Sequence, residues 1–251
     1  MSQKSEEGRP EAGPRERYPS GVGQKFDVDG AVRPFAGNTI ICHLNETSPL
    51  QEPLKALYAE LETSRLAALY TLLPPSSWHM TVFEGICDQV RKPEYWPSEL
   101  PLDASLTECN AFFEDRLNDF DCDFRAPIRM SISSFRPLVD GISLKLTPID
   151  AAEEIRLRGF RNQLADVLTL RPPGHDDYVF HLSIAYLIRH LTEDQGAELS
   201  ALQARAFDAM PAEFELGAPE FCHFGDMFEF RRQFFLESEG SNHERIAQAS
   251  R

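Results

Sequence analysis

Apolar residues recur at helical spacing in four segments of the chain. These segments cover about residues 50–61, 106–120, 150–168 and 192–206. Asp150 and Glu153, like Thr192 and Gln195, have the spacing of helix-capping boxes. The pattern therefore predicts four amphipathic helices, two of which begin at defined residues.

Strand-like runs lie between the predicted helices. Their sequences are NTIICHL, LAALYTLL, WHMTVFEG, APIRMSISSF, GISLKLT, YVFHLSIAYLI and EFCHFGDMFEFRRQFFL. Two successive halves of the chain share an order of strand, helix, histidine-containing strand and helix. The order predicts an α+β fold of two similar lobes, residues 36–135 and 136–237. Each lobe is expected to be an antiparallel or mixed sheet with helices on its outer face, and the lobes form a central cleft.

The two ends of the chain differ from the patterned region 36–237. Residues 1–35 are rich in glycine, proline and charge, which predicts a disordered arm, and residues 238–251 read as a polar tail. No run of about eighteen apolar residues occurs, so no membrane span is expected. The N-terminus lacks the apolar core of a signal peptide, which favours a cytoplasmic protein.

Charge and cysteine content narrow the possible functions. A formal net charge of −15 argues against a protein that binds long nucleic acid, because such proteins usually present a basic surface. A small nucleotide or the end of an oligonucleotide is the more suitable substrate. The five cysteines include no C-x-x-C pair, which favours reduced thiols over a disulfide framework. The oligomeric state is left open by the sequence.

Two tetrapeptides carry the chemistry, His79-Met80-Thr81-Val82 and His181-Leu182-Ser183-Ile184. Both read histidine, apolar, hydroxyl, apolar, and they occupy corresponding places in the two halves. In a random sequence of this composition, two such matches arise roughly once in a hundred. A third match at His190 lacks the apolar positions, and Thr192 is better explained as a helix cap.

Strand alternation places each histidine beside its hydroxyl. Residues i and i+2 of a strand share a face, so His79 lies with Thr81, and His181 lies with Ser183. On the second strand, alternation also predicts a wholly apolar opposite face. Its members are Tyr178, Phe180, Leu182, Ile184 and Tyr186.

This arrangement suits phosphodiester chemistry. One histidine can take a proton from the attacking oxygen and the other can give a proton to the leaving oxygen, because imidazole titrates near neutral pH. The hydroxyls of Thr81 and Ser183 can bind the non-bridging oxygens. We therefore predict His79 and His181 as catalytic and Thr81 and Ser183 as substrate-binding, with no metal and no cofactor.

The paired tetrapeptides resemble those of the two-histidine phosphoesterase superfamily. It includes 2′,3′-cyclic nucleotide phosphodiesterases, bacterial RNA 2′-5′ ligase-like enzymes and RNA-processing phosphodiesterases. The resemblance covers about residues 36–237 and implies two α+β lobes around a cleft, each donating one motif. The phrases PFAGNTIICHL and WHMTVFEG look like those of a poorly characterised bacterial and fungal branch. Serine in place of threonine at position 183 keeps the hydroxyl.

Several alternatives remain open at this stage. The same residues would serve an RNA-end ligase, another phosphodiester transferase or a non-catalytic nucleotide-binding module. A fold could instead gather His79, His181, His175 and His223 around zinc, although no compact ligand spacing supports this. Lys145, Arg129 and Phe83 could each contact substrate or serve only the fold.

Overall fold

The protein is an α+β structure, described by a computed structural model over residues 17–118, 120 and 124–236. Its described helices are α1 (Gln51–Glu62), α2 (Leu106–Asn118), α3 (Ala151–Val167) and α4 (Glu193–Phe207). Its described strands are β1 (Gly37–His43), β2 (Tyr70–Leu72), β3 (His79–Phe83), β4 (Ile128–Phe135), β5 (Gly141–Pro148), β6 (His181–Leu187), β7 (Glu213–Leu216), β8 (Glu220–Phe224) and β9 (Phe230–Phe235). The predicted α+β class is thus confirmed.

The helices begin where the sequence predicts them. In α4, the Thr192 hydroxyl accepts the Gln195 N–H and the Gln195 side chain accepts the Thr192 N–H, so the capping box is complete. In α3, Asp150 accepts the Glu153 N–H, but the Glu153 carboxylate bonds the backbone N–H of Arg129 instead of closing a box. Both caps satisfy helix N–H groups that would otherwise have no partner.

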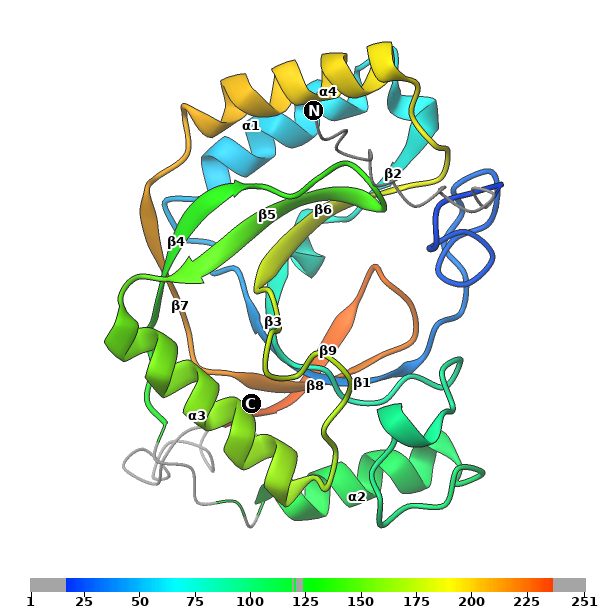
Figure 1. Cartoon of the computed structure of the whole chain (residues 1–251), viewed down its shortest axis with the longest axis vertical. Coiled ribbons are helices and arrows are strands. Elements are labelled where there is room, and N and C mark those ends of the chain that lie inside the picture. The colour runs from blue at the N-terminus through cyan, green and yellow to red at the C-terminus, as the bar shows by residue number, and fades with distance from the viewer. Residues whose placement is uncertain (1–16, 119, 121–123, 237–251) are drawn as a thin grey trace, which may run out of the picture.

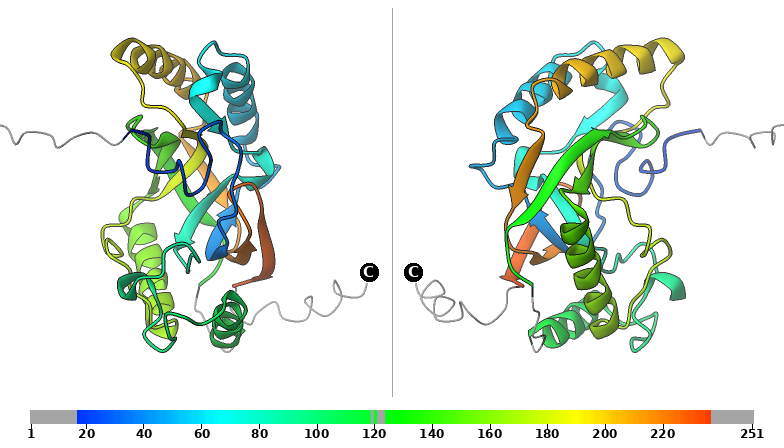
Figure 2. Two further views of the ribbon diagram at one scale, coloured as in Figure 1. Left: turned by 90° about the vertical axis from the view of Figure 1, so that its right-hand side faces the viewer. Right: turned by 60° about the vertical axis from the view of Figure 1, so that its left-hand side comes forward.

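The described strands form one sheet, in the order β7-β4-β5-β6-β3-β1-β8-β9, with β2 paired to β6. All of these pairs are antiparallel. The centre of the sheet joins β3 and β6 through the Met80–Leu182 pair, so the two histidine strands are neighbours. Figures 1 and 2 show α1 and α4 side by side at one end of the molecule, with α2 and α3 at the other.

Strand pairing does not follow the two halves of the chain. The predicted boundary between residues 135 and 136 falls inside the hairpin of β4 and β5, which pair directly. The last two strands, β8 and β9, return to the edge of β1. They arise from a single run that the sequence presents as one strand. The division into two lobes therefore stays a prediction.

The N-terminal segment corrects one prediction. Residues 17–35 are not a free arm, because Phe26 is fully buried and Phe35 is nearly so, in a small apolar cluster with Leu73, Ile188 and Met227. Ser20 also bonds Asp140 through its N–H and hydroxyl. Aromatic burial thus outweighs the turn-rich composition of this segment. Residues 1–16 and the predicted tail 238–251 lie outside the described part.

Two further expectations can be compared with the described residues. None of their helices is long and apolar enough to cross a membrane. The four described cysteines, Cys42, Cys87, Cys109 and Cys222, are free thiols, as predicted; Cys122 lies outside the described residues.

Candidate active site

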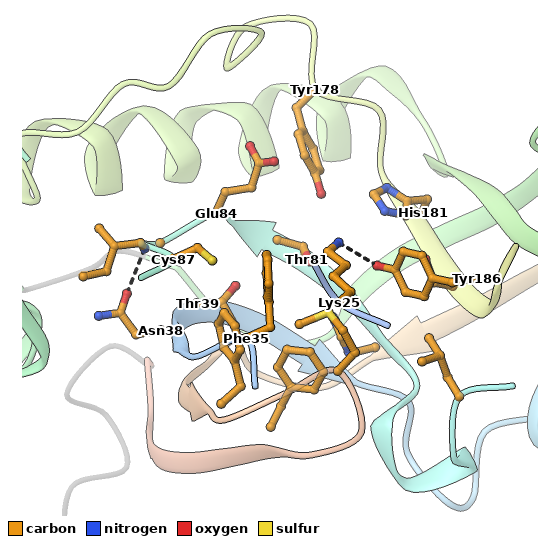
Figure 3. A pocket seen from close by; sticks show the side chains of 18 residues that line it. Lys25, Phe35, Asn38, Thr39, Thr81, Glu84, Cys87, Tyr178, His181 and Tyr186 are labelled. Atoms are coloured by element: carbon orange, nitrogen blue, oxygen red, sulfur yellow. Dashed lines mark hydrogen bonds between the residues drawn. The ribbon is translucent and has the colours of Figure 1, made fainter. Parts of the chain in front are cut away.

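The four predicted site residues line one pocket. His79 and Thr81 reach it from β3, and His181 and Ser183 reach it from β6. The pocket has a volume of about 260 Å³. Figure 3 shows part of its lining, with His181 and Thr81 pointing toward a shared space. The structure therefore brings together both predicted histidines and both predicted hydroxyls.

A β-bulge in β3 adds a residue to the pocket wall. In the pairing with β1, Ile40 faces Phe83 and Ile41 faces Thr81, which leaves Val82 as the extra residue. Alternation shifts at a bulge. Val82 and Phe83 are consequently both buried, and Glu84 returns to the pocket side.

The strand β6 carries the same irregularity. Against β5, Ile142 faces Ala185 and Ser143 faces Ser183, so Ile184 is the extra residue. Tyr186 is thereby turned toward the pocket. The predicted apolar face from Tyr178 to Tyr186 is wrong at both ends, because the bulge reverses Tyr186 and because Tyr178 precedes the strand and also lines the pocket. Phe180, Leu182 and Ile184 are buried as predicted.

Both histidine rings are oriented in the same way. Nδ1 of His79 lies 2.7 Å from the carbonyl oxygen of Ser77, and Nδ1 of His181 lies 2.9 Å from that of Val179. A carbonyl only accepts hydrogen bonds, so each Nδ1 carries a proton. In the neutral ring, Nε2 is then the basic nitrogen, and it is the nitrogen available to a ligand in the pocket.

Burial lowers the pKa of both imidazoles. The pKa of His79 falls to about 4, chiefly through desolvation, while the Ser77 carbonyl opposes the shift and the charges of His43 and His181 add to it. The pKa of His181 is also lowered by desolvation, with further contributions from Arg136 and Lys25. A bound phosphate would act in the opposite direction, because a nearby anion favours the imidazolium form.

Lys25 is a pocket residue that the sequence does not indicate. Its Nζ lies 3.0 Å from the hydroxyl oxygen of Tyr186, 4.7 Å from the centre of the Tyr186 ring and 5.4 Å from that of Phe35. Burial alone would lower its pKa, but the interactions with Tyr186, Cys87 and Asp140 together outweigh burial and raise it. Lys25 is therefore a cation that lines the same pocket as the two histidines, and Figure 3 shows it with His181. The two aromatic residues Phe26 and Phe35 are the sequence feature that indicates packing of this segment, since aromatic residues are rare in disordered arms.

Tyr178 and Glu84 add polar groups near the histidines (Figure 3). The Tyr178 ring packs on the Arg161 guanidinium, whose Cζ lies 4.3 Å from the ring centre. Desolvation raises the pKa of Tyr178 well above its usual value, so the phenol keeps its proton and can donate a hydrogen bond. Desolvation also raises the pKa of the Glu84 carboxyl.

An aromatic wall closes the pocket beside His79. The Phe230 ring lies 4.3 Å from the His79 ring, centre to centre, and 5.2 Å from that of Phe224. Phe224 in turn stacks with Phe35 at 6.5 Å. Such a wall limits water around the imidazole and offers a flat apolar surface to a ligand ring.

The remaining candidates fall outside the described pocket. Phe83 is fully buried and packs on His175. Arg129 pairs with Asp150 at 3.3 Å, away from the histidines. Lys145 lies directly opposite His181 in the β5–β6 pair and is exposed, but it is not part of the pocket lining.

The four histidines considered for zinc are not gathered. His175 lies 3.1 Å from the side-chain oxygen of Asn162, and His223 lies 3.2 Å from the Glu114 carboxylate. Neither of them lines the pocket of His79 and His181.

A different group in the described chain has metal-binding atoms close together. The ligand atoms of His43, Glu220 and Cys222 lie within 4.8 Å of one another, and nitrogen, oxygen and sulfur donors suit zinc. However, Glu220 already pairs with His43 at 3.0 Å and with Arg232 at 3.4 Å. The donor atoms of these residues are of the types that zinc prefers, but the positive charge of Arg232 beside Glu220 disfavours binding of a metal cation there.

Comparison with known proteins supplies the family. Residues 25–139 match the model of a two-histidine phosphodiesterase family described as a domain of unknown function, DUF1868. The structure is similar to that of the conserved protein of unknown function ATU0111 from Agrobacterium tumefaciens strain C58. The TM-score is 0.80 at 27% identity, over 89% of this chain and 95% of that chain. A second structure, TT0787 of Thermus thermophilus, has a TM-score of 0.44 at 15% identity, over 80% of this chain and 98% of that chain. No curated protein matches the chain. The family match places residues 25–139 of this chain in the two-histidine phosphoesterase superfamily.

Proposed function

We propose that this protein is a metal-independent phosphodiesterase that hydrolyses a cyclic phosphate or phosphodiester of a nucleotide or RNA end. The observation that carries the proposal is the shared orientation of His79 and His181. Each Nδ1 is held by a backbone carbonyl, which leaves two Nε2 atoms for one ligand in one pocket. Family membership supports phosphodiesterase chemistry, and the substrate is our inference.

The proposed site lies in a cleft between two lobes. One lobe would contain β4, β5, β6 and β7, and the other would contain β1, β3, β8 and β9, so that each lobe donates one histidine strand. The join at Met80 and Leu182 supports this division. The antiparallel direction of the pair puts His79 and His181 at diagonal positions, which in such pairs are about 7–8 Å apart. A phosphate hydrogen-bonded on two sides fills that span.

In the proposed reaction, water attacks phosphorus in line with the departing ribose oxygen. One Nε2 accepts a proton from the water as the new P–O bond forms. The other histidine, protonated at Nε2, gives its proton to the ribose oxygen as the old P–O bond breaks. Thr81, Ser183 and the Tyr178 phenol would bind the non-bridging oxygens and stabilise their growing charge. A cyclic phosphate gives a nucleoside monophosphate as the single product, whereas a linear diester also releases the nucleoside that carries the departing ribose oxygen. In both cases the two histidines have exchanged protonation states.

A turnover assay tests the proposal. The purified protein is incubated with nucleoside 2′,3′-cyclic phosphates and with linear 2′-5′ and 3′-5′ dinucleotides, and products are separated by chromatography. Cleavage of at least one class, lost in His79→Ala and in His181→Ala, is the expected result. Binding of these compounds without turnover would instead support a nucleotide-binding module. Joining of RNA ends in place of cleavage would indicate a ligase.

A further inference from the structure

A second recess opens beside the pocket, between β6 and the turn that joins β4 to β5. Its volume is about 470 Å³. It shares Lys25, His181, Ser183 and Tyr186 with the pocket described above. A ligand in the pocket could therefore extend into the recess without leaving the protein surface.

The wall of the recess carries Arg136, which directly follows β4. Its backbone is fixed by a hydrogen bond from its N–H to the Ser143 carbonyl oxygen at 2.8 Å. Its guanidinium forms no ion pair within the described residues. Its positive charge helps to lower the pKa of His181 and opposes the rise in the pKa of Tyr178. Arg136 thus contributes an uncompensated charge close to the site.

Two lysines add positive charge around the same strand. Lys25 stands on the border between pocket and recess, and Lys145 faces His181 from β5. Neither one has a carboxylate ion-pair partner within the described chain. The one carboxylate of the recess, Asp140, accepts two hydrogen bonds from Ser20. Lys145 lines neither the pocket nor the recess, so the cations of the recess are Arg136 and Lys25. In a chain of formal net charge −15, two cations without an ion pair in one recess point to an anionic ligand.

The part of the pocket that the recess does not share is lined by a carboxyl group and by aromatic rings, and its described lining has no arginine or second lysine. The Glu84 carboxyl lines the pocket but not the recess. The aromatic wall of Phe35, Phe224 and Phe230 belongs to the pocket alone. A substrate with a second anionic group is thus expected to place that group toward Arg136, away from Glu84.

We propose that this recess is a second anion subsite, which binds a phosphate of the substrate other than the one between His79 and His181. The proposal rests on the proposed function and narrows its substrate class to nucleotides that carry an additional phosphate. Arg136 binds this phosphate, and Lys25 contacts it from the border with the pocket. Guanidinium suits the task because its paired N–H groups match two phosphate oxygens.

The test compares a nucleoside 2′,3′-cyclic phosphate having a 5′-hydroxyl with the same compound having a 5′-phosphate. We expect kcat/KM to be higher for the 5′-phosphorylated compound, mainly through a lower KM. In Arg136→Gln, the ratio of the two kcat/KM values should fall about tenfold or more, as expected for one charge-assisted hydrogen bond. Arg136→Lys should restore part of the ratio. Arg205→Gln is the matched control, because Arg205 pairs with Glu60 on the far helices and should keep the wild-type ratio.

Two outcomes would overturn the proposal. One is a wild-type enzyme that treats both compounds alike, and the other is an Arg136→Gln enzyme that keeps the full preference. Titration calorimetry with the same two compounds separates this failure from failure of the proposed function. If the protein cleaves neither compound but binds the 5′-phosphorylated one more tightly, and Arg136→Gln removes that difference, the subsite proposal is supported and the phosphodiesterase proposal is contradicted.

Discussion

Glu84 and Tyr186 occupy equivalent positions in two different strands. Each follows its site histidine by the same number of residues, beyond a bulge at Val82 or Ile184. Each is returned by that bulge to the pocket that the histidine lines. The repeat thus extends past the tetrapeptides, and it gives one end of the pocket a carboxyl and the other a phenol bonded to Lys25.

The two histidines should be needed together. Replacing either with alanine should lower kcat by about 10²- to 10⁴-fold, since each supplies one proton transfer. The double variant should be far less than multiplicatively worse, because the two act as a unit. Steady-state kinetics measures this, with thermal unfolding to verify the fold. His190→Ala, in the rejected third match, is the control, and a loss there equal to that of His79→Ala would contradict the assignment.

The hydroxyls should matter less than the imidazoles. Thr81→Ala and Ser183→Ala each remove one hydrogen bond to a charged phosphate, which costs about 1.5–3 kcal/mol. We expect kcat/KM to fall by about ten- to a hundredfold in each variant. Thr81→Ser and Ser183→Thr keep the hydroxyl and should recover most of the rate. Unchanged kinetics in both alanine variants would remove these residues from the phosphate site.

Folding stability should depend on pH through His79. Its pKa is near the ordinary value of about 6.5 in the unfolded chain, and burial lowers it to about 4 in the folded protein. Between these two values the unfolded chain takes up a proton that the folded protein does not, so stability falls as pH drops from about 6.5 to about 4. Above that window the histidine is neutral in both states and has no effect.

Removing the imidazole should flatten this part of the stability curve. In His79→Gln, the free energy of unfolding should fall less between pH 6.5 and pH 4 than in the wild type. A shift of about 2.5 pKa units at 1.36 kcal/mol per unit sets an upper limit of about 3.4 kcal/mol on the difference, and the measured value should be smaller because solvent reaches the ring. Urea denaturation at a series of pH values measures it. Parallel curves for the two proteins would show that His79 is not buried in a way that disfavours its charge.

Activity should not require a metal ion. Dialysis against EDTA should leave kcat within about twofold, because two imidazoles suffice for both proton transfers. Cys222→Ser, which removes one donor from the His43 and Glu220 group, should leave turnover similar to that of the untreated enzyme. Loss of activity on chelation, with recovery on adding zinc or manganese, would instead identify a metal-assisted reaction.

The N-terminal segment should contribute measurably to stability. Phe26→Ala removes a fully buried ring from the small cluster with Phe35, and large-to-small changes of this kind cost about 3–5 kcal/mol. Val28→Ala, at an exposed position of the same segment, should change stability by less than about 0.5 kcal/mol. Denaturant unfolding compares the two. Equal stability of both variants would mean that the segment is not packed on the domain.

Local patterns in the sequence predict local structure well in this chain. The Thr192 cap and the alternation around His79 and His181 depend only on nearby residues. The sequence alone therefore predicts where this helix begins and which side chains of the two motifs share a face. The bulges at Val82 and Ile184 do not, because an extra residue in one strand is defined only against its partner. Alternation alone therefore predicts the wrong face for Tyr186.

Long-range features were missed for a related reason. Lys25 enters the pocket because Phe26 and Phe35 bury themselves against residues far along the chain, and composition alone favoured an arm. The hairpin of β4 and β5 crosses the predicted boundary between lobes because pairing, not order along the chain, decides which strands are neighbours.

The pairing of β1 with β8 has a consequence for the timing of synthesis. The partner β3 is made soon after β1, but β8 appears only near the end of the chain. A ribosome adds about 5–20 residues per second, so on the order of ten seconds passes before the second edge of β1 can be covered. During that interval an apolar strand edge at Ile40 and Ile41 is open to other nascent chains.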